Sequence, residues 1–432
     1  MSLLPTWREV PATPGAIVAP DERLPWPQTA AMGVQHVIAM FGATVLAPIL
    51  MGFDPNVAIL MSGIGTLIFF VIVGGQVPSY LGSSFAFIGV VIAATGYAGG
   101  GANANLGVAL GGIVVCGLVY ALIGLLVMGV GTAWIESLMP PVVTGAVVAV
   151  IGLNLAGIPI KNMAPTDFDK WMQAVTFICV GLVAVRTSGM TQRLLILVGL
   201  IAATLIYAVL ANGFGLGKPI DLSALAQAAW FGAPHFAAPV FSGPAILLIA
   251  PVAVILVAEN LGHVKAVGAM TGRPLDRYMG RAFLGDGIAT MVSGASGGTG
   301  VTTYAENIGV MAATKIYSTA MFVVAALIAV LLGFSPKFGA LIQTIPLPVM
   351  GGVSIVVFGL IAVAGAKIWV DNKVNFADNT NLIVAAVTLV LGTGDYTVKF
   401  GGFALGGIGT ATFGAIALHW LLKKKPQGAD RP

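Results

Sequence analysis

The stretch that decides the fold runs from residue 294 to residue 315 and reads GASGGTGVTTYAENIGVMAATK. A glycine-rich run is followed by the β-branched and aromatic residues 301–304, and then by a segment compatible with a helix. This order predicts a short extended piece that turns into a half-helix around Glu306. Non-helical backbone at membrane depth is tolerated only where it is buried in protein or lines a cavity. We therefore expect this stretch to line a binding site.

The composition places the chain in a membrane. Of its 432 residues 58% are hydrophobic and 8% are charged, whereas a soluble domain carries about 25% charged residues. The mean hydropathy is +0.98, and apolar runs of spanning length recur from about residue 28 to residue 422. Too few charges remain to cover a soluble surface, so we expect an all-α polytopic membrane protein. A transmembrane barrel would need short alternating strands, which the long apolar runs do not supply.

Hydropathy, with Gly, Pro and charge as breaks, predicts fourteen spans. The spans are expected near 28–50, 57–75, 82–96, 106–129, 138–158, 171–186, 191–211, 243–263, 280–294, 301–314, 316–334, 348–366, 379–394 and 400–422. The third and the tenth are short and follow Gly-rich or Ser/Thr-rich sequence. We expect short extended segments there instead of continuous helices.

The two halves of the chain resemble each other. The run SSFAFIGV from Ser83 matches TTYAENIGV from Thr302 with one residue inserted. The run PVVTGAVVAVIGL from Pro141 matches PVMGGVSIVVFGL from Pro348. Both pairs occur in the same order, half a chain apart, which predicts a duplication of seven spans. An odd number of spans inserts the second copy upside down, as in many secondary transporters.

The distribution of Lys and Arg predicts that both termini are cytoplasmic. In that topology fifteen of the 20 basic residues lie inside and five outside. The expected parts are a cytoplasmic tail 1–27, a first repeat 28–211, an external loop 212–242, a second repeat 243–422 and a cytoplasmic tail 423–432. The net charge is only +4, so these basic residues read as topology determinants and no nucleic-acid partner is expected.

Two glutamates lie in segments that otherwise belong in hydrocarbon. Glu259 is in PVAVILVAENLGH (251–263), and Glu306 is in the broken segment quoted above. An ionisable residue inside a membrane is costly and usually marks a substrate or ion pathway. His263 follows Glu259 by four residues, hence on the same helix face, where it could share or relay a proton. The alternative is that either glutamate pairs with a buried polar group and holds helices together.

The breaks in the third and tenth spans would expose the N–H donors of two helix N-termini, with Glu306 as an acceptor beside them. A nucleobase, which carries both N–H and carbonyl groups, fits such a site, whereas the glutamates would repel an anion. Gln35 and His36 in the first span are expected to form interhelical hydrogen bonds, with substrate contact as the second interpretation. Asp286 is expected at a helix end or in packing beside its two glycines.

The sequence lacks the motifs of ATP-driven pumps and of common enzymes. The sequence contains no GxxxxGK[ST] phosphate loop, no HExxH and no evident Ser–His–Asp constellation, so neither ATP-driven pumping nor an enzyme is supported. Cys116 and Cys179 lie far from any CxxC pattern, so no metal is expected. We expect no cofactor, with the proton as coupling ion.

The chain resembles the nucleobase–ascorbate transporters, the nucleobase:cation symporter-2 family, essentially from end to end, and the resemblance includes the motifs around Glu259 and Glu306. The landmarks are Gln35-His36, YLGSSFAFIG, AENLGH and ENIGVMAATK. The last of them fits the family signature: Glu or Gln, Asn, any residue, Gly, four variable residues, Thr, then Lys, Arg or Gly. The runs APDERLP, LMPPVVTGAV and GFSPKFGALI resemble the pyrimidine permeases that accompany Rut-type uracil-degradation operons.

The resemblance implies proton-coupled import of uracil or a close pyrimidine across the cytoplasmic (inner) membrane. It implies a core domain of spans one to four and eight to eleven, and a gate domain of spans five to seven and twelve to fourteen. Glu259 and Glu306 would receive the hydrogen bonds of the base, and His263 would assist proton coupling. The other residues that it implies at the substrate are the backbone of Phe85 and Ala305, and the side chains of Ser84, Tyr304, Ala43 and Phe358.

Two departures from the family pattern and several alternatives remain. Ala305 stands where uracil carriers can have Gly, and Phe358 stands where a gate-domain Tyr can occur. Glu at position 306 leans toward the uracil branch and away from the xanthine/urate branch. The alternatives are a purine permease, an anion exchanger or channel of the same fold, and, least favoured, a membrane enzyme. Lipid is an expected partner, and a homodimer is left open.

Overall fold

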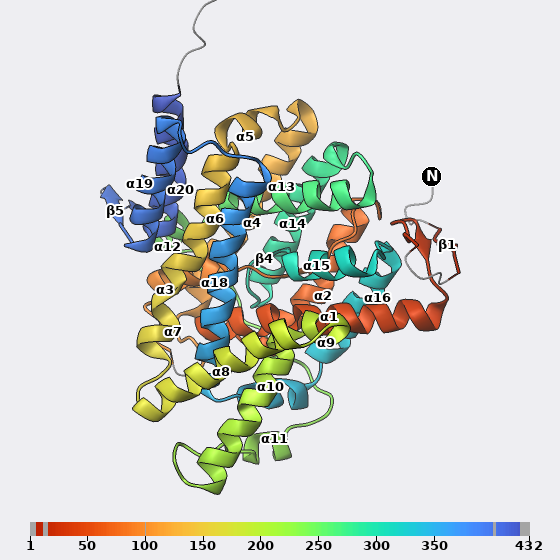
Figure 1. The fold of residues 1–432 in the computed structure, drawn as a ribbon, viewed down its shortest axis with the longest axis vertical. Coiled ribbons are helices and arrows are strands. Elements are labelled where there is room, and N and C mark those ends of the chain that lie inside the picture. Colours follow the sequence, from red (N-terminus) through yellow and green to blue (C-terminus); the bar gives the residue numbers. More distant parts are fainter. Residues whose placement is uncertain (1–5, 12–15, 100, 401–402, 424–432) are drawn as a thin grey trace, which may run out of the picture. The chain divides into compact units, whose positions relative to one another are not determined.

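The computed structural model describes residues 6–11, 16–99, 101–400 and 403–423 (Figure 1). The chain divides into two compact units. The first contains residues 1–131 and 157–356, and the second contains residues 132–156 and 357–432. Both candidate glutamates belong to the first unit.

Helices dominate the first unit. They are α1 Trp26–Met51, α2 Pro55–Ile72, α3 Ala86–Thr95, α4 Leu106–Val130, α7 Gly157–Asn162, α8 Asp167–Arg186, α9 Gly189–Arg193, α10 Leu195–Ala208, α11 Ser223–Gln227, α12 Gly243–Ile249, α13 Val252–Thr271, α14 Met279–Ala295, α15 Ala305–Thr314, α16 Thr319–Gly333 and α17 Pro336–Gln343, with a π-helical turn at Val209–Gly213 and a 3₁₀ turn at Asp276–Tyr278. The strands are β1 Arg8–Glu9, β2 Glu22–Arg23, β3 Leu81–Ser83 and β4 Val301–Thr303.

The second unit is smaller. It contains α5 Ala133–Leu138, α6 Pro141–Leu155, α19 Asn379–Thr393, α20 Gly407–Leu422 and the strands β5 Val398–Phe400 and β6 Phe403–Leu405. Helix α18, Leu347–Asp371, begins in the first unit and ends in the second. Within the second unit α6, α19 and α20 pack against one another.

Local chemistry explains where several helices start and stop. The Asp54 carboxylate caps α2 by accepting the N–H of Asn56 at 2.7 Å, and Pro55 occupies the first helical position. Thr166 and Asp169 form a reciprocal capping box at α8. Gly52 ends α1 with a φ of 73°, in the left-handed region that glycine adopts without strain.

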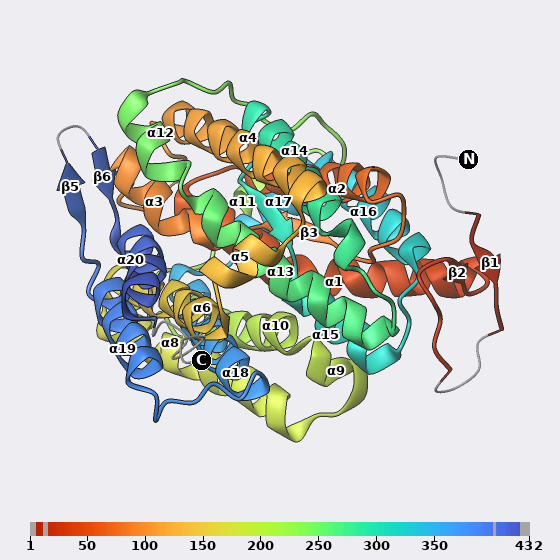
Figure 2. The same ribbon diagram turned by 90° about the horizontal axis from the view of Figure 1, so that it is seen from above.

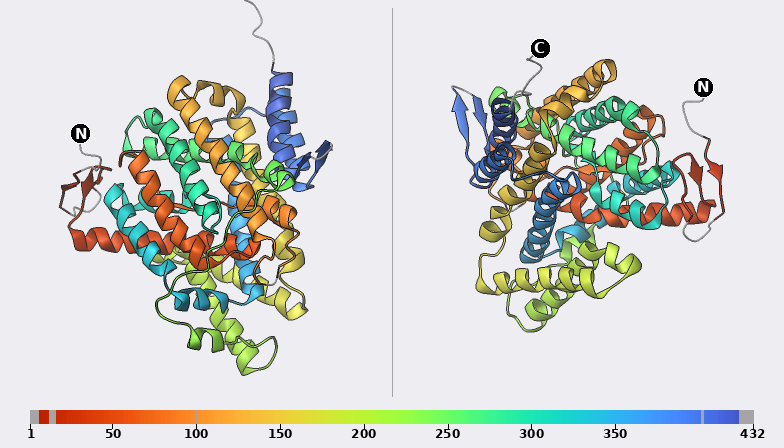
Figure 3. Two further views of the ribbon diagram at one scale, coloured as in Figure 1. Left: turned by 180° about the vertical axis from the view of Figure 1, so that it is seen from behind. Right: turned by 45° about the horizontal axis from the view of Figure 1, so that its top comes forward.

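Helix pairs build the core of the first unit. Helix α14 packs along α4 and against α2 (Figure 2), and α16 packs against α1 and α2. Small residues permit the closest approach: a Cβ on Gly287 would lie 2.4 Å from the Ala121 backbone nitrogen, and one on Gly124 would lie 2.4 Å from that of Leu284. Helices α8 and α10 pack on each other (Figure 3). Close contact through glycine is the usual way in which helices associate in lipid.

Eight helical stretches among the described residues are long and apolar enough to cross a membrane. A ninth arises if α16 and α17, bent by 82°, count as one span. The remaining apolar helices are shorter, and α3 and α15 have ten residues each. An α-helix rises 1.5 Å per residue, so neither half-helix can cross about 30 Å of hydrocarbon alone. The polytopic helical class is confirmed, and the count of fourteen spans stays a prediction.

The extended piece predicted before Glu306 is confirmed by β4. The extended segment expected in the third span is also present: β3 covers Leu81–Ser83, and the helix α3 follows it closely, because Phe85 already has helical φ and ψ. Strand β3 ends at Ser83, which is the last residue opposite a residue of β4. The external loop predicted at 212–242 contains the short helix α11.

The close approach of β3 and β4 yields a stability prediction. A Cβ on Gly82 would lie 2.5 Å from the ring of Tyr304, and that ring is fixed by hydrogen bonds of its hydroxyl. Gly82→Ala should lower the free energy of unfolding by about 1–3 kcal/mol through overpacking. The midpoint of thermal unfolding in detergent measures it. Gly129→Ala is the control, since a Cβ at that position would meet nothing within 4 Å; equal midpoints for the two variants would contradict the prediction.

Candidate functional site

The site is organised by a two-stranded antiparallel sheet at the centre of the first unit. Gly82 of β3 lies opposite Thr302 of β4. Beyond the paired residues, the Ser84 N–H donates to the Gly300 carbonyl at 2.9 Å, and the Tyr304 N–H donates to the Tyr80 carbonyl at 3.0 Å. The two strands therefore satisfy each other's backbone groups, as required where water is absent.

Two threonines satisfy the outer edges of this sheet. Thr66 of α2 accepts the N–H of Leu81 at 2.9 Å. Thr290 of α14 accepts the N–H of Val301 at 3.2 Å and donates to the carbonyl of the same residue at 2.9 Å. A hydroxyl both donates and accepts, so one threonine serves an edge that would otherwise be unpaired. Each strand thus has the same kind of support on its free side.

Each strand leads directly into a ten-residue helix. Phe85 precedes α3, and the buried Ser84 hydroxyl accepts the Ala86 N–H at 3.3 Å. Tyr304 precedes α15, whose first residue, Ala305, is exposed. The first N–H groups of such helices lack intrahelical partners and carry partial positive charge. The chain brings the N-termini of two helices to the two ends of one small sheet.

The two glutamates come from different helices that pack together. Glu306 lies in the first turn of α15, and Glu259 lies near the middle of α13, which packs against α3, β4 and α15. Both side chains are half-buried, and they are close enough for their charges to repel each other. Among the residues described, no hydrogen bond or ion pair engages the Glu259 carboxylate. The predicted juxtaposition of a carboxylate with a helix N-terminus is present at α15.

Tyr304 ties the site to α1. Its hydroxyl donates to the Ser83 carbonyl at 2.9 Å and accepts from the Thr44 hydroxyl at 3.2 Å. The neighbouring Ala43 is buried, with 1% of its surface exposed. The Tyr304 hydroxyl is therefore engaged by the protein, which fixes the ring between β3 and α1.

His263 has a partner that the sequence did not indicate. Its Nδ1 lies 2.8 Å from the Thr303 hydroxyl of β4. The predicted partner was Glu259, one helical turn away on the same face of α13. This hydrogen bond links α13 to strand β4, which leads into the helix that contains Glu306.

Asp286 lies in the middle of α14, so of the two expected roles, helix end or packing beside its glycines, the structure has the second: Gly285 packs against α2 and Gly287 against α4. The carboxylate is fully buried and accepts a hydrogen bond from Asn260 Nδ2 at 2.6 Å. Asn260 also donates to the Tyr120 hydroxyl at 3.0 Å, and that hydroxyl donates to the Leu256 carbonyl at 3.2 Å.

Tyr120, Asn260 and Asp286 form a buried polar cluster, and Asn260 is the residue after Glu259 in the chain. The Oδ1 atoms of Asn260 and Asp286 are buried without a partner among the described residues. Sequence reasoning missed the cluster, although Asn260 within AENLGH was a signal. A buried polar group without a partner is unusual and calls for a physical reason.

The predicted interhelical role of His36 is confirmed. Asn307 Nδ2 lies 2.9 Å from His36 Nδ1 and donates to the His36 carbonyl at 3.1 Å, so that α15 is fastened to α1. The His36 ring also lies against Phe322 of α16, with 4.6 Å between ring centroids. The neighbouring Gln35 differs: its Nε2 is buried and has no partner among the described residues.

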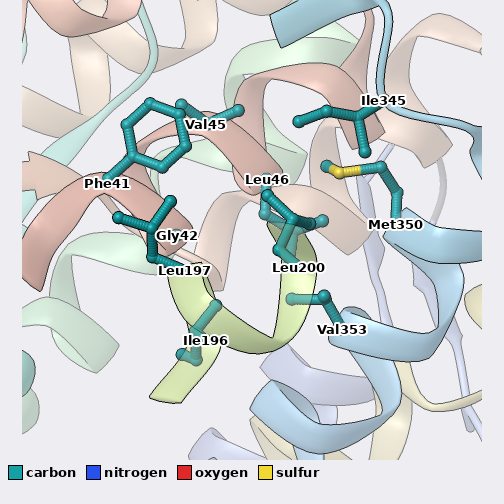
Figure 4. Close-up of a pocket in the computed structure, with 10 residues that line it drawn as sticks. All are labelled: Phe41, Gly42, Val45, Leu46, Ile196, Leu197, Leu200, Ile345, Met350 and Val353. Carbon is teal, nitrogen blue, oxygen red and sulfur yellow. The ribbon is translucent and has the colours of Figure 1, made fainter. Parts of the chain in front are cut away.

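Two cavities lie away from the glutamates. One of about 10 Å³ in the first unit is lined by apolar side chains of α1, α10 and α18 and by Ile345 (Figure 4). It has room for no more than about one water and no polar lining, so it is not a site for a polar ligand. The other, about 320 Å³, is in the second unit and is lined by Trp134, Ser137, Leu138, Ile416, His419, Trp420 and Lys423.

Phe358 belongs to the second unit, in α18, and is buried there. Its predicted contact with substrate therefore stays a prediction, as does the division into core and gate domains. Within the described part of the chain, no three His, Cys, Asp or Glu residues form a group that could hold a metal.

Comparison with known proteins gives consistent matches along the chain. Residues 27–400 match the model described as the Permease family, Xan_ur_permease. The chain is 68% identical to the putative pyrimidine permease RutG of Escherichia coli K12, over 98% of this chain and 96% of that protein. It is 40% identical to the uracil permease of Bacillus caldolyticus, over 92% of this chain and 93% of that protein.

The fold also resembles solved transporters of low sequence similarity. The transmembrane domain of the cyanobacterial bicarbonate transporter BicA matches with a TM-score of 0.62 at 15% identity, covering 85% of this chain and 96% of that domain. The murine anion transporter Slc26a9 in its inward-facing state matches with a TM-score of 0.65 at 12% identity, covering 91% of this chain and 68% of that chain. These likenesses concern the fold alone.

The buried cluster around Asp286 yields a second prediction. Tyr120→Phe removes the hydroxyl that accepts from Asn260 and donates to Leu256. It should lower the free energy of unfolding by about 1–3 kcal/mol, because buried polar groups lose their partner. Thermal unfolding in detergent measures it. Tyr97→Phe is the matched control, since that hydroxyl bonds the Gly101 carbonyl at an exposed site; no difference between the two variants would refute the prediction.

Proposed function

This chain belongs to the Permease family of nucleobase–ascorbate transporters, and from that premise we propose that it imports uracil or a close pyrimidine by proton symport. It is a multi-pass membrane protein, a transporter and not an enzyme. The pyrimidine substrate rests on the relatives, which are named pyrimidine permease and uracil permease. The proton as coupling ion and the cytoplasmic membrane as location are part of the proposal.

One observation carries the substrate class. Two carboxylates, Glu259 and Glu306, lie beside a sheet from whose ends two helix N-termini start. A uracil ring presents N–H donors and carbonyl acceptors on its edge, so carboxylates would accept from the ring N–H groups. Helix N-terminal amides at Phe85 and Ala305 would donate to the carbonyls. Ser84, Tyr304 and Ala43 would line the pocket around the base.

The same arrangement disfavours the alternatives. An anion would be attracted by the helix ends but repelled by two nearby carboxylates. The likeness to anion transporters therefore supports a shared fold and no shared substrate. A purine carrier has no observation of its own in its favour, since the relatives named above are pyrimidine and uracil permeases.

The proton is proposed to travel on Glu259, with help from His263. Two like charges that share a site repel each other, and a proton on one of them removes that repulsion. The Glu259 carboxylate has no hydrogen bond or ion pair within the described residues that would oppose protonation. The His263 ring forms a hydrogen bond with the Thr303 hydroxyl and so connects α13 to strand β4, which precedes the helix that contains Glu306. We propose that protonation of Glu259 acts on the substrate site through its charge, which lies beside that of Glu306.

The proposed topology has fourteen spans in two inverted repeats, with both termini cytoplasmic. The support lies in corresponding details of the two halves. Strand β3 is followed by a ten-residue helix and has a threonine of α2 at its edge. Strand β4 is likewise followed by a ten-residue helix and has a threonine of α14 at its edge. An inverted duplication explains both coincidences at once.

Uptake by purified protein in liposomes tests the proposal. Radiolabelled uracil should accumulate when an inward proton gradient is imposed and should fail to accumulate when an uncoupler collapses it. Unlabelled uracil should compete strongly and xanthine weakly. Competition by xanthine alone would select the purine carrier, and anion uptake insensitive to the uncoupler would select the exchanger.

Glu306→Gln should lose uracil binding without losing the fold. The amide keeps the size of the side chain but presents a donor to the N–H groups of the base. An unpaired buried polar group costs about 1–3 kcal/mol, or about a tenfold to hundredfold loss of affinity. Calorimetry or scintillation proximity with labelled uracil measures it. Asp221→Asn, in the exposed connection before α11, should retain the original affinity; an equal affinity in folded Glu306→Gln protein would remove Glu306 from the substrate site.

Glu259→Gln should behave as a carrier that is permanently protonated. It should exchange internal for external uracil, with weakened affinity, and should not accumulate uracil against its gradient. Both modes are measured on the same proteoliposomes, with wild-type protein under a collapsed proton gradient as the reference. Retained pH-driven accumulation would show that the proton travels elsewhere. Loss of exchange, accumulation and folding together would make Glu259 a structural residue.

A further inference from the structure

The residues before the first helix are attached to the site helices. Strands β1 and β2 pair in parallel, with Arg8 opposite Glu22 and Glu9 opposite Arg23 (Figure 2). The Arg23 guanidinium also forms an ion pair with Glu9 at 2.6 Å. We call residues 7–11 and 16–23 together the strap.

The strap forms backbone hydrogen bonds at the C-terminus of α15, the half-helix whose first turn contains Glu306. The buried Val18 forms a parallel bridge with Ile316. Its N–H donates to the Lys315 carbonyl at 3.1 Å, and its carbonyl accepts from the Tyr317 N–H at 2.8 Å. Lys315 is the residue at which α15 ends, in a left-handed conformation with φ 59°. The strap therefore satisfies backbone groups at the terminus of the helix.

A second set of contacts joins the strap to Thr319, the first residue of α16. The Pro20 carbonyl accepts from both the backbone N–H and the hydroxyl of Thr319, at 3.1 and 2.8 Å. The Trp7 indole N–H donates to the same hydroxyl at 2.9 Å. The Trp7 ring stacks on Phe70 of α2 with 5.9 Å between centroids. The segment that joins α15 to α16 is thus fixed on both sides.

The strap also reaches the helix that carries Glu259. The Asp21 carboxylate accepts from Arg273 at 2.5 Å, two residues beyond the end of α13. The Ala19 N–H and the Arg8 guanidinium both bond the Glu22 carboxylate and hold its pKa below the usual 4.5, against the opposing charge of Asp21. A lowered carboxyl pKa stabilises the fold above the unfolded pKa, and that stabilisation is lost only as the pH falls through the folded value. The contacts that Glu22 makes within the strap are therefore retained at neutral pH.

We propose that the strap is a positioning element that holds α15, the half-helix that begins beside Glu306, in place at its far end. A ten-residue helix is marginal on its own. Helix α15 is held at its start by the β3–β4 sheet, in its first turn by Asn307 on His36, and at its end by the strap. The strap's exposed ion pairs contribute little, so the backbone bonds of Val18 to the end of α15 carry most of the positioning.

The test uses Val18→Pro in the full-length protein. Proline removes the N–H that donates to Lys315. Ile17→Pro is the matched control, because Ile17 is exposed and its N–H has no hydrogen bond among the described residues. Hydrogen–deuterium exchange should be about tenfold faster in residues 305–314 of Val18→Pro, the effect of one lost hydrogen bond. Exchange in α2 should not change, and neither region should change in Ile17→Pro.

A second readout is uracil affinity, and this part of the inference rests on the proposed function. Val18→Pro should weaken uracil binding several-fold while its midpoint of thermal unfolding stays near that of Ile17→Pro. Unchanged exchange in residues 305–314 would overturn the strap, whether or not uracil binds. Faster exchange in α2 as well would show a merely structural role and overturn it too. If wild-type protein fails to bind uracil, local loosening in Val18→Pro would still support the strap, and the missing binding would refute the proposed substrate.

If Val18→Pro does not fold, Trp7→Phe tests the other attachment of the strap, to Thr319 at the start of α16, which holds the segment after α15. Phenylalanine keeps an aromatic ring against Phe70, while it removes the N–H that donates to Thr319 and shortens the ring that also contacts Trp26. Exchange should rise in residues 305–314 and remain unchanged in α2. Equal exchange in Trp7→Phe and wild-type protein would overturn the strap.

Discussion

Inside a membrane every backbone N–H and carbonyl must find its partner within the protein, and the β3–β4 pair is where this constraint shapes the molecule. Six residues that are not helical satisfy one another across the pair, and Thr66 and Thr290 satisfy the outer edges. The pairing leaves no strand edge for lipid or for another chain. It also dictates that a helix starts at each end of the sheet, because the chain has no other way to continue through hydrocarbon.

The chemistry of the site follows from that arrangement. Helices that begin inside the protein present amide donors there, so an acceptor such as Glu306 can be tolerated in their first turn. Glu259 is brought up from a neighbouring helix, and His263 on that helix bonds Thr303 of the sheet. The residue after Glu259, Asn260, belongs to the buried cluster around Asp286. Carboxylate acceptors and helix N-terminal amide donors lie beside one small sheet. Such an environment suits a planar ligand that has both N–H and carbonyl groups.

A binding site built on short helices needs to be held from outside. Long membrane helices are stabilised by their own hydrogen bonds and by close packing through glycine, as for α4 and α14. The ten-residue α15 has less of either, and its contacts with α1, the sheet and the N-terminal residues compensate. The residues before α1 are thereby in contact with the helix that carries Glu306. A site held at several points can keep its geometry while other parts of a transporter move.

The sequence by itself determined the membrane class, the helical character of the chain, the break before Glu306 and the family. These features are local: hydropathy, β-branching, glycine runs and short motifs are written in consecutive residues. Only the tertiary structure decided that His263 bonds Thr303, that Asp286 is buried in mid-helix beside Asn260, and that Val18 meets Ile316. These contacts depend on which faces of the helices meet. In a membrane protein both the lipid-facing and the inward faces are apolar, so hydrophobic periodicity does not reveal which face is inward. Polar partners far apart in the chain were therefore visible only once the helices were packed.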